Sequence, residues 1–292
     1  MMRRPGQSPL LIVSALALAL SLAACDNSTD APSGKDAAPA TDSEQPAPTG
    51  NTDAGGGGDG QKARPVPARL SHQTETLERR PPDCDGDDCP MFEVHLQVYD
   101  GQPELNAAVR RRLAGQLVVT SESPATPDSL EAAADQFLAT AAGVSGEGSR
   151  GWELSGDTKQ LGRWRDLVTV AINSYEFTGG AHGMPITQWL NWDLAENHAV
   201  PLGRLIVSGQ EEAFWDAAER AHARWVEKEA PSDEGFREDW PFQQTDSYRI
   251  TRNGVVLHYD VYSIAPYSMG QPELTVPWSD LAGVIQPSYR PY

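Results

Sequence analysis

Alternating apolar and polar residues predict strands in the middle of the chain. From Phe92 to Val98 every second residue is apolar, which is the period of a strand with one buried face. Strand character returns at Trp152–Leu154, Trp164–Phe177 and Ile186–Leu194, so we expect three further strands there.

The last third of the chain predicts a hairpin. Asn253 and Gly254 stand between "YRITR" and "VVLHYDVYSI", and both residue types tolerate the positive φ of a two-residue hairpin turn. The later stretch "ELTVPWSDLAGVI" predicts one more strand followed by a short helix.

Three segments predict helices. Glu104–Val119 and Ser129–Ala142 both begin shortly after a proline, a common first-turn residue, and Asp128 is a candidate cap for the second. Gln210–Glu229 has apolar residues at helical spacing and charges elsewhere. Because helices interrupt the strands without regular alternation, we expect an α+β fold, with helices packed on a mixed or antiparallel sheet.

The N-terminus has the pattern of an export signal. Arg3 and Arg4 precede the apolar run Leu10–Leu22, which is short for a hydrocarbon core of ~30 Å. The run ends in Leu22-Ala23-Ala24-Cys25, which resembles the lipobox of bacterial lipoproteins. An ordinary secretory peptide with a chance cysteine is the alternative.

The lipobox resemblance implies cleavage before Cys25, a diacylglycerol on its thiol and a third acyl chain on its amine. Because each buried methylene contributes ~0.8 kcal/mol, such a lipid would anchor the protein to a membrane without spanning it. We therefore expect a lipoprotein of the cell envelope facing the periplasm. Asp26 and Asn27 favour the inner membrane slightly over the outer one, by resemblance to enterobacterial sorting signals.

Composition divides the rest of the chain. The segment after Cys25, up to residue 66, consists largely of Asp, Ala, Pro, Gly, Ser and Thr without an aromatic residue, so we expect a disordered tether with its ends ~35 Å apart. The predicted order is a signal peptide (1–24), lipidated Cys25 with its linker (25–66), an N-terminal α+β lobe (67–170) and a C-terminal α+β lobe (171–292). The sequence leaves open whether the two lobes share one core.

The net charge narrows the range of partners. The formal charge of −18 would become about −20 after loss of Arg3 and Arg4 with the signal peptide. Such a chain repels nucleic acid and anionic lipid head groups, and it attracts cationic proteins. A solvated acidic surface without a partner is the simpler alternative.

The cysteines beyond residue 25 predict a disulfide. Cys84 and Cys89 enclose "DGDD", and in an oxidising compartment such a close pair most simply closes a loop. A zinc site made from this pair with His72 and His95 is the alternative. Its weakness is that no second cysteine pair is present.

A calcium site and other cofactors are not indicated. The acidic loop that begins at Asp83 fails the EF-hand pattern, because its sixth residue, Asp88, is not glycine and its twelfth, Val94, is not glutamate. We expect no metal and no cofactor other than the covalent lipid on Cys25.

Catalytic signatures are absent from the sequence. It contains no G-x-S-x-G, S-x-x-K or H-E-x-x-H pattern and no phosphate-binding glycine loop with its lysine. A glycosidase with paired carboxylates stays open. Trp189 and Trp192 fall on opposite faces of their predicted strand, so at least one belongs in a core. We therefore expect that this protein is not an enzyme.

Two groups of motifs resemble a bacterial domain family. Tyr175 is followed by "TGGAHG" at Thr178–Gly183 and "NWD" at Asn191–Asp193; "APYSMG" at Ala265–Gly270 is followed by "VPWSDL" at Val276–Leu281. These motifs are similar to those of the extracytoplasmic domains of RsiV-type anti-sigma factors. They are also similar to the accessory domain of PdaC-type peptidoglycan deacetylases. The resemblance covers Tyr175–Ile285, and over Phe92–Leu167 only the order of strands and helices matches.

This resemblance implies an α+β fold and, in its anti-sigma members, binding of lysozyme outside the cell. The deacetylase motifs Thr-Phe-Asp-Asp-Gly and His-x-x-x-His are absent here, so we expect the non-catalytic module on a lipid anchor. The expected partner is a lysozyme-type cationic protein. The alternative is a peptidoglycan-binding module, and an uncharacterised cell-wall hydrolase ranks last.

The motifs supply the candidate binding residues Gly179, Gly180, His182, Gly183, Tyr267 and Gly270. Glycines permit the positive φ that a tight link between strands needs. His182 is expected to hydrogen-bond the exposed backbone of that link. Contact with a partner, and catalysis or metal binding, are the open alternatives for this residue.

Overall fold

The computed structural model describes residues 69–84, 86, 88–119, 125–144, 148–230 and 235–290. The predicted signal peptide, Cys25 and the linker lie outside these residues. No helix within the described ranges is both long and apolar enough to cross a membrane.

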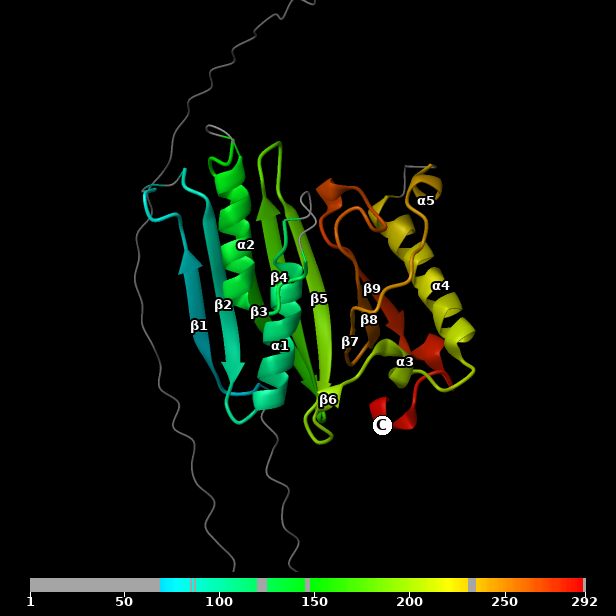
Figure 1. Cartoon of the computed structure of the whole chain (residues 1–292). Coiled ribbons are helices and arrows are strands. Elements are labelled where there is room, and N and C mark those ends of the chain that lie inside the picture. Colours follow the sequence, from blue (N-terminus) through cyan, green and yellow to red (C-terminus); the bar gives the residue numbers. More distant parts are fainter. Residues whose placement is uncertain are drawn as a thin grey trace, which may run out of the picture. The chain divides into compact units, whose positions relative to one another are not determined.

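A six-stranded sheet forms the first half of the described chain (Figure 1). Its strands lie in sequence order: β1 (His72–Arg79), β2 (Met91–Tyr99), β3 (Glu153–Trp164), β4 (Leu167–Phe177), β5 (Met184–Asp193) and β6 (His198–Ala199). Only β2 and β3 run parallel, and the other neighbours are antiparallel. A parallel pair needs a long crossover, which two helices supply here.

Helices α1 (Pro103–Gln116) and α2 (Leu130–Gly143) pack on one face of this sheet (Figure 1). Gly156 of β3 makes room for α1, because a Cβ there would lie 2.8 Å from Leu113 Cδ1. The predicted cap Asp128 is wrong. Ser129 is the N-cap of α2, since its hydroxyl accepts a hydrogen bond from Ala132 N at 3.1 Å.

The second half contains a three-stranded antiparallel sheet of β7 (Tyr248–Ile250), β8 (Gly254–His258) and β9 (Glu273–Pro277). Helix α4 (Glu211–Glu229) covers one face of it and shares a hydrophobic core with β8 and β9 (Figure 1). Short elements complete this half: α3 (Leu202–Leu205), α5 (Phe236–Asp239), and the 3₁₀ turns η1 (Tyr267–Met269), η2 (Trp278–Leu281) and η3 (Pro287–Tyr289).

The two sheets meet on the face of the first sheet that lies opposite α1 and α2. Val170 and Ile172 of β4 belong to the helix-side core, whereas Ala171 between them packs with Trp189 of β5 and Val256 of β8. Trp189 and Trp192 are both buried, on opposite faces of β5. The described chain is therefore an α+β fold, as predicted, with one large core in each half and a small apolar contact between the sheets.

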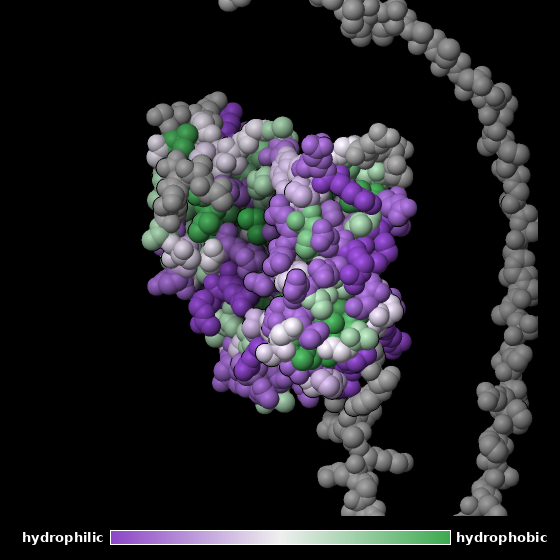
Figure 2. All heavy atoms as spheres, turned by 90° about the vertical axis from the view of Figure 1, so that its right-hand side faces the viewer, coloured by the Kyte–Doolittle hydropathy of each residue, from purple (hydrophilic) through white to green (hydrophobic). Residues whose placement is uncertain are grey.

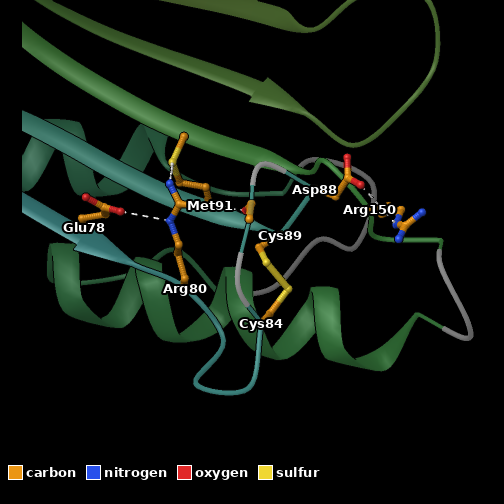
Figure 3. Close-up of a disulfide and its surroundings, with 8 residues drawn as sticks. Glu78, Arg80, Cys84, Asp88, Cys89, Met91 and Arg150 are labelled. Carbon is orange, nitrogen blue, oxygen red and sulfur yellow. Dashed lines mark hydrogen bonds and ion pairs between the residues drawn. A yellow bond between two sulfur atoms is a disulfide. The ribbon is translucent and has the colours of Figure 1, made fainter.

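The predicted disulfide is confirmed. Cys84 and Cys89 are bonded, with their Cα atoms 5.8 Å apart, in the connection between β1 and β2 (Figure 3). Arg80 fixes the loop through hydrogen bonds to Glu78 Oε1 (3.0 Å) and Gly86 O (3.1 Å). The disulfide and the bond to Gly86 thus stabilise the loop that joins β1 to β2, while pairing with β2 holds β1 in the sheet.

Two expectations about the C-terminal strands need correction. The strand predicted over "VVLHYDVYSI" ends at His258, because the following segment turns away and Tyr262 adopts φ 62°. In the β7–β8 hairpin, Gly254 has φ 156° whereas Asn253 has no positive φ. Glycine is needed at position 254 by close approach, since a Cβ there would lie 2.0 Å from Val276 O.

Candidate functional site at the turn between the fourth and fifth strands

The turn between β4 and β5 carries the first sequence motif. Gly179 and Gly180 have φ values of 101° and 96°, which residues with a Cβ rarely adopt. A Cβ at either position would meet no atom within 4 Å. The backbone conformation, rather than crowding, therefore requires glycine at both positions.

His182 is exposed, yet both of its ring nitrogens have a contact. Nδ1 lies 3.1 Å from Gly183 O, and Nε2 lies 3.3 Å from the Tyr262 hydroxyl. Because a carbonyl only accepts, these contacts favour the tautomer with its proton on Nδ1, which leaves Nε2 to accept from Tyr262. The ring also stacks on Tyr267, with centroids 3.9 Å apart and planes 21° from parallel. These contacts fix the orientation of the imidazole.

Gly183 is the point at which the two motifs meet. A Cβ there would lie 2.4 Å from Tyr175 Cζ and 2.6 Å from Glu176 O, so the Tyr175 ring lies directly against the glycine backbone. From the second motif, the Tyr267 hydroxyl donates a hydrogen bond to Gly183 O at 3.0 Å. Only a residue without a side chain fits between these neighbours.

Tyr262 and Met184 expose large apolar side chains beside this turn. They are 46% and 38% exposed, and they are the large hydrophobic side chains found exposed in the part of the chain that the structure describes. Tyr262 also has φ 62°, and backbone strain of this kind is concentrated at functional sites. We call His182, Tyr262 and Tyr267, whose rings contact one another, the aromatic patch.

Asp260 holds the segment that carries Tyr262 against β5. Its Oδ1 accepts hydrogen bonds from Thr187 N (2.7 Å) and Gln271 Nε2 (2.8 Å). Burial raises the pKa of Asp260, and these two hydrogen bonds oppose part of that shift. The Ser247 hydroxyl accepts a hydrogen bond from Trp189 N (3.3 Å), which lies on β5 like Thr187. Side chains thus occupy outward backbone donors of β5, which would otherwise form a free sheet edge.

The residues considered above as possible zinc ligands do not form a metal site. Cys84 and Cys89 are joined in the disulfide, and His95 Nε2 lies 3.0 Å from Glu93 Oε1. Within the ranges that the structure describes, no group of three or more His, Cys, Asp or Glu side chains is placed to hold a metal ion.

The structure thus joins three of the six candidate residues, His182, Gly183 and Tyr267, although 84 positions separate Gly183 from Tyr267. Gly179 and Gly180 shape the turn, and Gly270 follows η1 with φ 70°. Tyr262 was not identified from the sequence. Tyr262 stands close before "APYSMG", but its apolar neighbours gave it the pattern of a strand.

A family model described as "Protein of unknown function (DUF3298)" matches residues 204–279. This segment includes Tyr262 and Tyr267 of the aromatic patch, whereas His182 lies outside it. No curated protein matches the chain.

Solved structures extend the similarity to most of the chain. The crystal structure of a DUF3298 family protein from Pseudomonas aeruginosa PAO1 is 35% identical, with a TM-score of 0.68; the match covers 77% of this chain and 98% of that chain. The crystal structure of a DUF3298 family member from Bacteroides fragilis NCTC 9343 is 17% identical, with a TM-score of 0.58, and the match covers 75% of this chain and 94% of that chain. The second similarity shows the fold alone.

Proposed function

The chain belongs to DUF3298, a family of proteins of unknown function, and we propose that it is a membrane-anchored envelope lipoprotein that binds a macromolecule and performs no chemistry. The observation that carries this proposal is the aromatic patch. Exposed Tyr side chains are enriched at protein interfaces, because they bury much apolar area at a modest cost in conformational entropy. Here the surrounding contacts orient the rings before any partner arrives, which lowers that cost further.

The lipobox supports the envelope location. Leu22-Ala23-Ala24-Cys25 follows an apolar run of signal-peptide length. In this proposal the acylated Cys25 holds the protein on a membrane, facing the periplasm, and the inner membrane is slightly favoured. The linker of residues 26–66 keeps the folded part close to that membrane.

The charge of the chain supports a cationic protein as the partner. The face over α4 is mostly hydrophilic, with apolar residues only in separate patches (Figure 2). Acidic side chains outnumber basic ones among the exposed residues of α4: Glu211, Glu212, Asp216, Glu219, Glu227 and Glu229. Such a surface raises the rate at which a basic protein arrives, and the effect weakens with salt. Lysozyme is the best candidate, because the sequence motifs resemble those of lysozyme-binding anti-sigma factors.

The test is titration of the full mature chain, in detergent, with lysozyme at low and at physiological ionic strength. We expect binding that weakens with salt. Tyr262→Gly should weaken binding about tenfold or more, because it removes the exposed ring of an interface anchor. This variant keeps the fold testable, since glycine accepts φ 62° without strain. No binding at low salt would exclude lysozyme.

The alternative is a peptidoglycan-binding module, which the deacetylase part of the resemblance favours. Co-sedimentation with purified sacculi, with and without excess lysozyme, distinguishes the two proposals. A sedimented protein that lysozyme does not displace supports wall binding. A cell-wall hydrolase ranks last, and zymography on peptidoglycan tests it.

A further inference from the structure

A groove lies on the face of the six-stranded sheet that is turned away from α1 and α2, next to the aromatic patch. Its volume is about 460 Å³, and strands β2 to β5 together with Gln271 line it. The alternation of side chains along each strand explains its character. Phe92, Val94 and Leu154 point into the helix-side core, so their neighbours in sequence point to the opposite face.

Hydrogen-bonding side chains cross the floor of the groove in a row. Asn173 Nδ2 donates to Asp157 Oδ1 at 2.9 Å. Thr187 Oγ1 lies 3.0 Å from Asn173 Oδ1 and 3.2 Å from Gln271 Oε1. A hydroxyl has one hydrogen to donate, so it satisfies only one of these two acceptors at a time. The row therefore keeps free capacity to accept a hydrogen bond from a ligand.

An aromatic ring closes one end of the groove. Tyr175 lies on the same face of β4 as Asn173, and its ring is held against Gly183. A ring fixed in this way offers a flat apolar surface at little further cost in entropy. Small-ligand sites combine apolar and aromatic walls with a few hydrogen-bonding groups that fix the ligand's orientation, and this groove offers both kinds of group.

The charged groups of the groove indicate the charge of its ligand. Its carboxylates, Asp157 and Glu93, each already have a donor, from Asn173 and from His95. Both carboxylates retain lone pairs that can accept hydrogen bonds from hydroxyl groups, and both repel an anion. We propose that this groove binds a neutral oligosaccharide, whose ring hydroxyls pair with the polar row while one sugar ring stacks on Tyr175. This proposal does not depend on the protein-binding role of the aromatic patch.

Calorimetric titration of the full mature chain in detergent tests the inference. The probes are chitotetraose, cellotetraose and an acidic oligogalacturonate. We expect at least one neutral tetramer to bind and the acidic probe not to bind. Stronger binding of chitotetraose would identify an acetamido-sugar polymer such as wall glycan as the source. Equal binding of cellotetraose would indicate neutral oligosaccharides in general. The inference is overturned if neither tetramer binds at ~10 mM, far above the Kd of a weak site, or if the acidic probe binds equally well.

Variants on one strand separate the site from its scaffold. Asp157→Ala should weaken binding about tenfold or more, the usual effect of losing a hydrogen bond to a charged group. Lys159→Ala is the matched control, because Lys159 is exposed on the same strand and the same face but does not line the groove. Equal loss in both variants would contradict the assignment. Tyr262→Gly should leave sugar binding unchanged, so this proposal and the protein-binding proposal can fail separately.

Discussion

At the scale of one residue, the close contacts around Gly183 restrict the turn between β4 and β5 to glycine at this position. Gly183→Ala should lower the free energy of unfolding by about 2 kcal/mol or more, because the new methyl group would overlap the Tyr175 ring and the carbonyl oxygen of Glu176. Urea titration measures the change. The control is Gly203→Ala, in the short helix α3, where a Cβ meets nothing within 4 Å; its effect should stay within about 0.5 kcal/mol. Equal stabilities of the two variants would show that the contact at Gly183 is not tight.

The buried His258 leads us to predict that the free energy of unfolding depends on pH. Its ring is buried against Trp189, at a centroid distance of 4.7 Å, and neither ring nitrogen has a hydrogen-bond partner among the described residues. Burial lowers its pKa to about 4, with Glu273 opposing the shift and Arg249 adding to it. The unfolded chain, with an ordinary histidine pKa of about 6.5, therefore binds more protons than the folded chain between pH ~6.5 and ~4.

The free energy of unfolding should consequently fall as the pH drops through that window, by about 3 kcal/mol at most from this residue. His258→Phe keeps a flat ring beside Trp189 and cannot be protonated, so it should remove this part of the pH dependence. Urea titrations at several pH values measure the difference between wild type and variant. That difference should be constant above pH ~7; a difference that stays constant down to pH ~4 would contradict the assignment.

At the scale of the element, strands with a clear apolar face were predictable and polar strands were not. The period-two pattern located β2 directly. Strand β1 was missed because nearly all of its side chains are exposed, so its residues carry no apolar alternation and the strand depends on backbone pairing with β2. Most of β3 was missed for a different reason. Its inward positions include Thr158 and Gln160, whose buried side chains accept hydrogen bonds from Gln97 N and Leu70 N, so the buried face does not show as a hydrophobic pattern.

The candidate site was predictable in its parts but not in its assembly. Glycines in "TGGAHG" indicate a tight turn by local backbone preference alone. The stacking of His182 on Tyr267 depends on how the two sheets meet, which no local pattern contains. Tyr262 was hidden for a related reason. The chain leaves the sheet after His258, and Asp260 Oδ1 instead accepts a hydrogen bond from Thr187 N, 73 positions away.

At the scale of the whole molecule, the two halves have separate cores and a thin junction. The apolar part of that junction consists of Ala171, Trp189 and Val256, with Leu161 packed against them. Arg249 also lies over the Trp189 ring, at 5.2 Å from its centroid. Both the aromatic patch and the sheet groove include residues from each half, so their geometry depends on this junction.

Asn191 forms one of the polar links across that junction and provides its test. The side chain is buried, at 2% exposed. Its Oδ1 accepts a hydrogen bond from Thr169 Oγ1, and its Nδ2 donates one to Tyr248 O, both at 2.6 Å. Asn191→Ala leaves the Tyr248 carbonyl buried without this donor, which should cost about 2–3 kcal/mol of stability. Because that bond joins the two sheets, the halves should also unfold less cooperatively.

Hydrogen exchange under native conditions measures this directly. In Asn191→Ala, amides of β7 and β8 should exchange at a lower free energy than those of β2 and β4, whereas in the wild type the two sets should open together. Asn173→Ala is the matched control, because the hydrogen bonds of Asn173 to Asp157 and Thr187 stay within the six-stranded sheet. Equal exchange of both halves in Asn191→Ala would mean that the sheets are coupled without this amide, by the apolar packing around Trp189 and by the hydrogen bonds that Trp189 N and Thr187 N donate to Ser247 and Asp260. The positions of Tyr267 and Gln271 relative to β5 would then depend on these other contacts and not on the amide of Asn191.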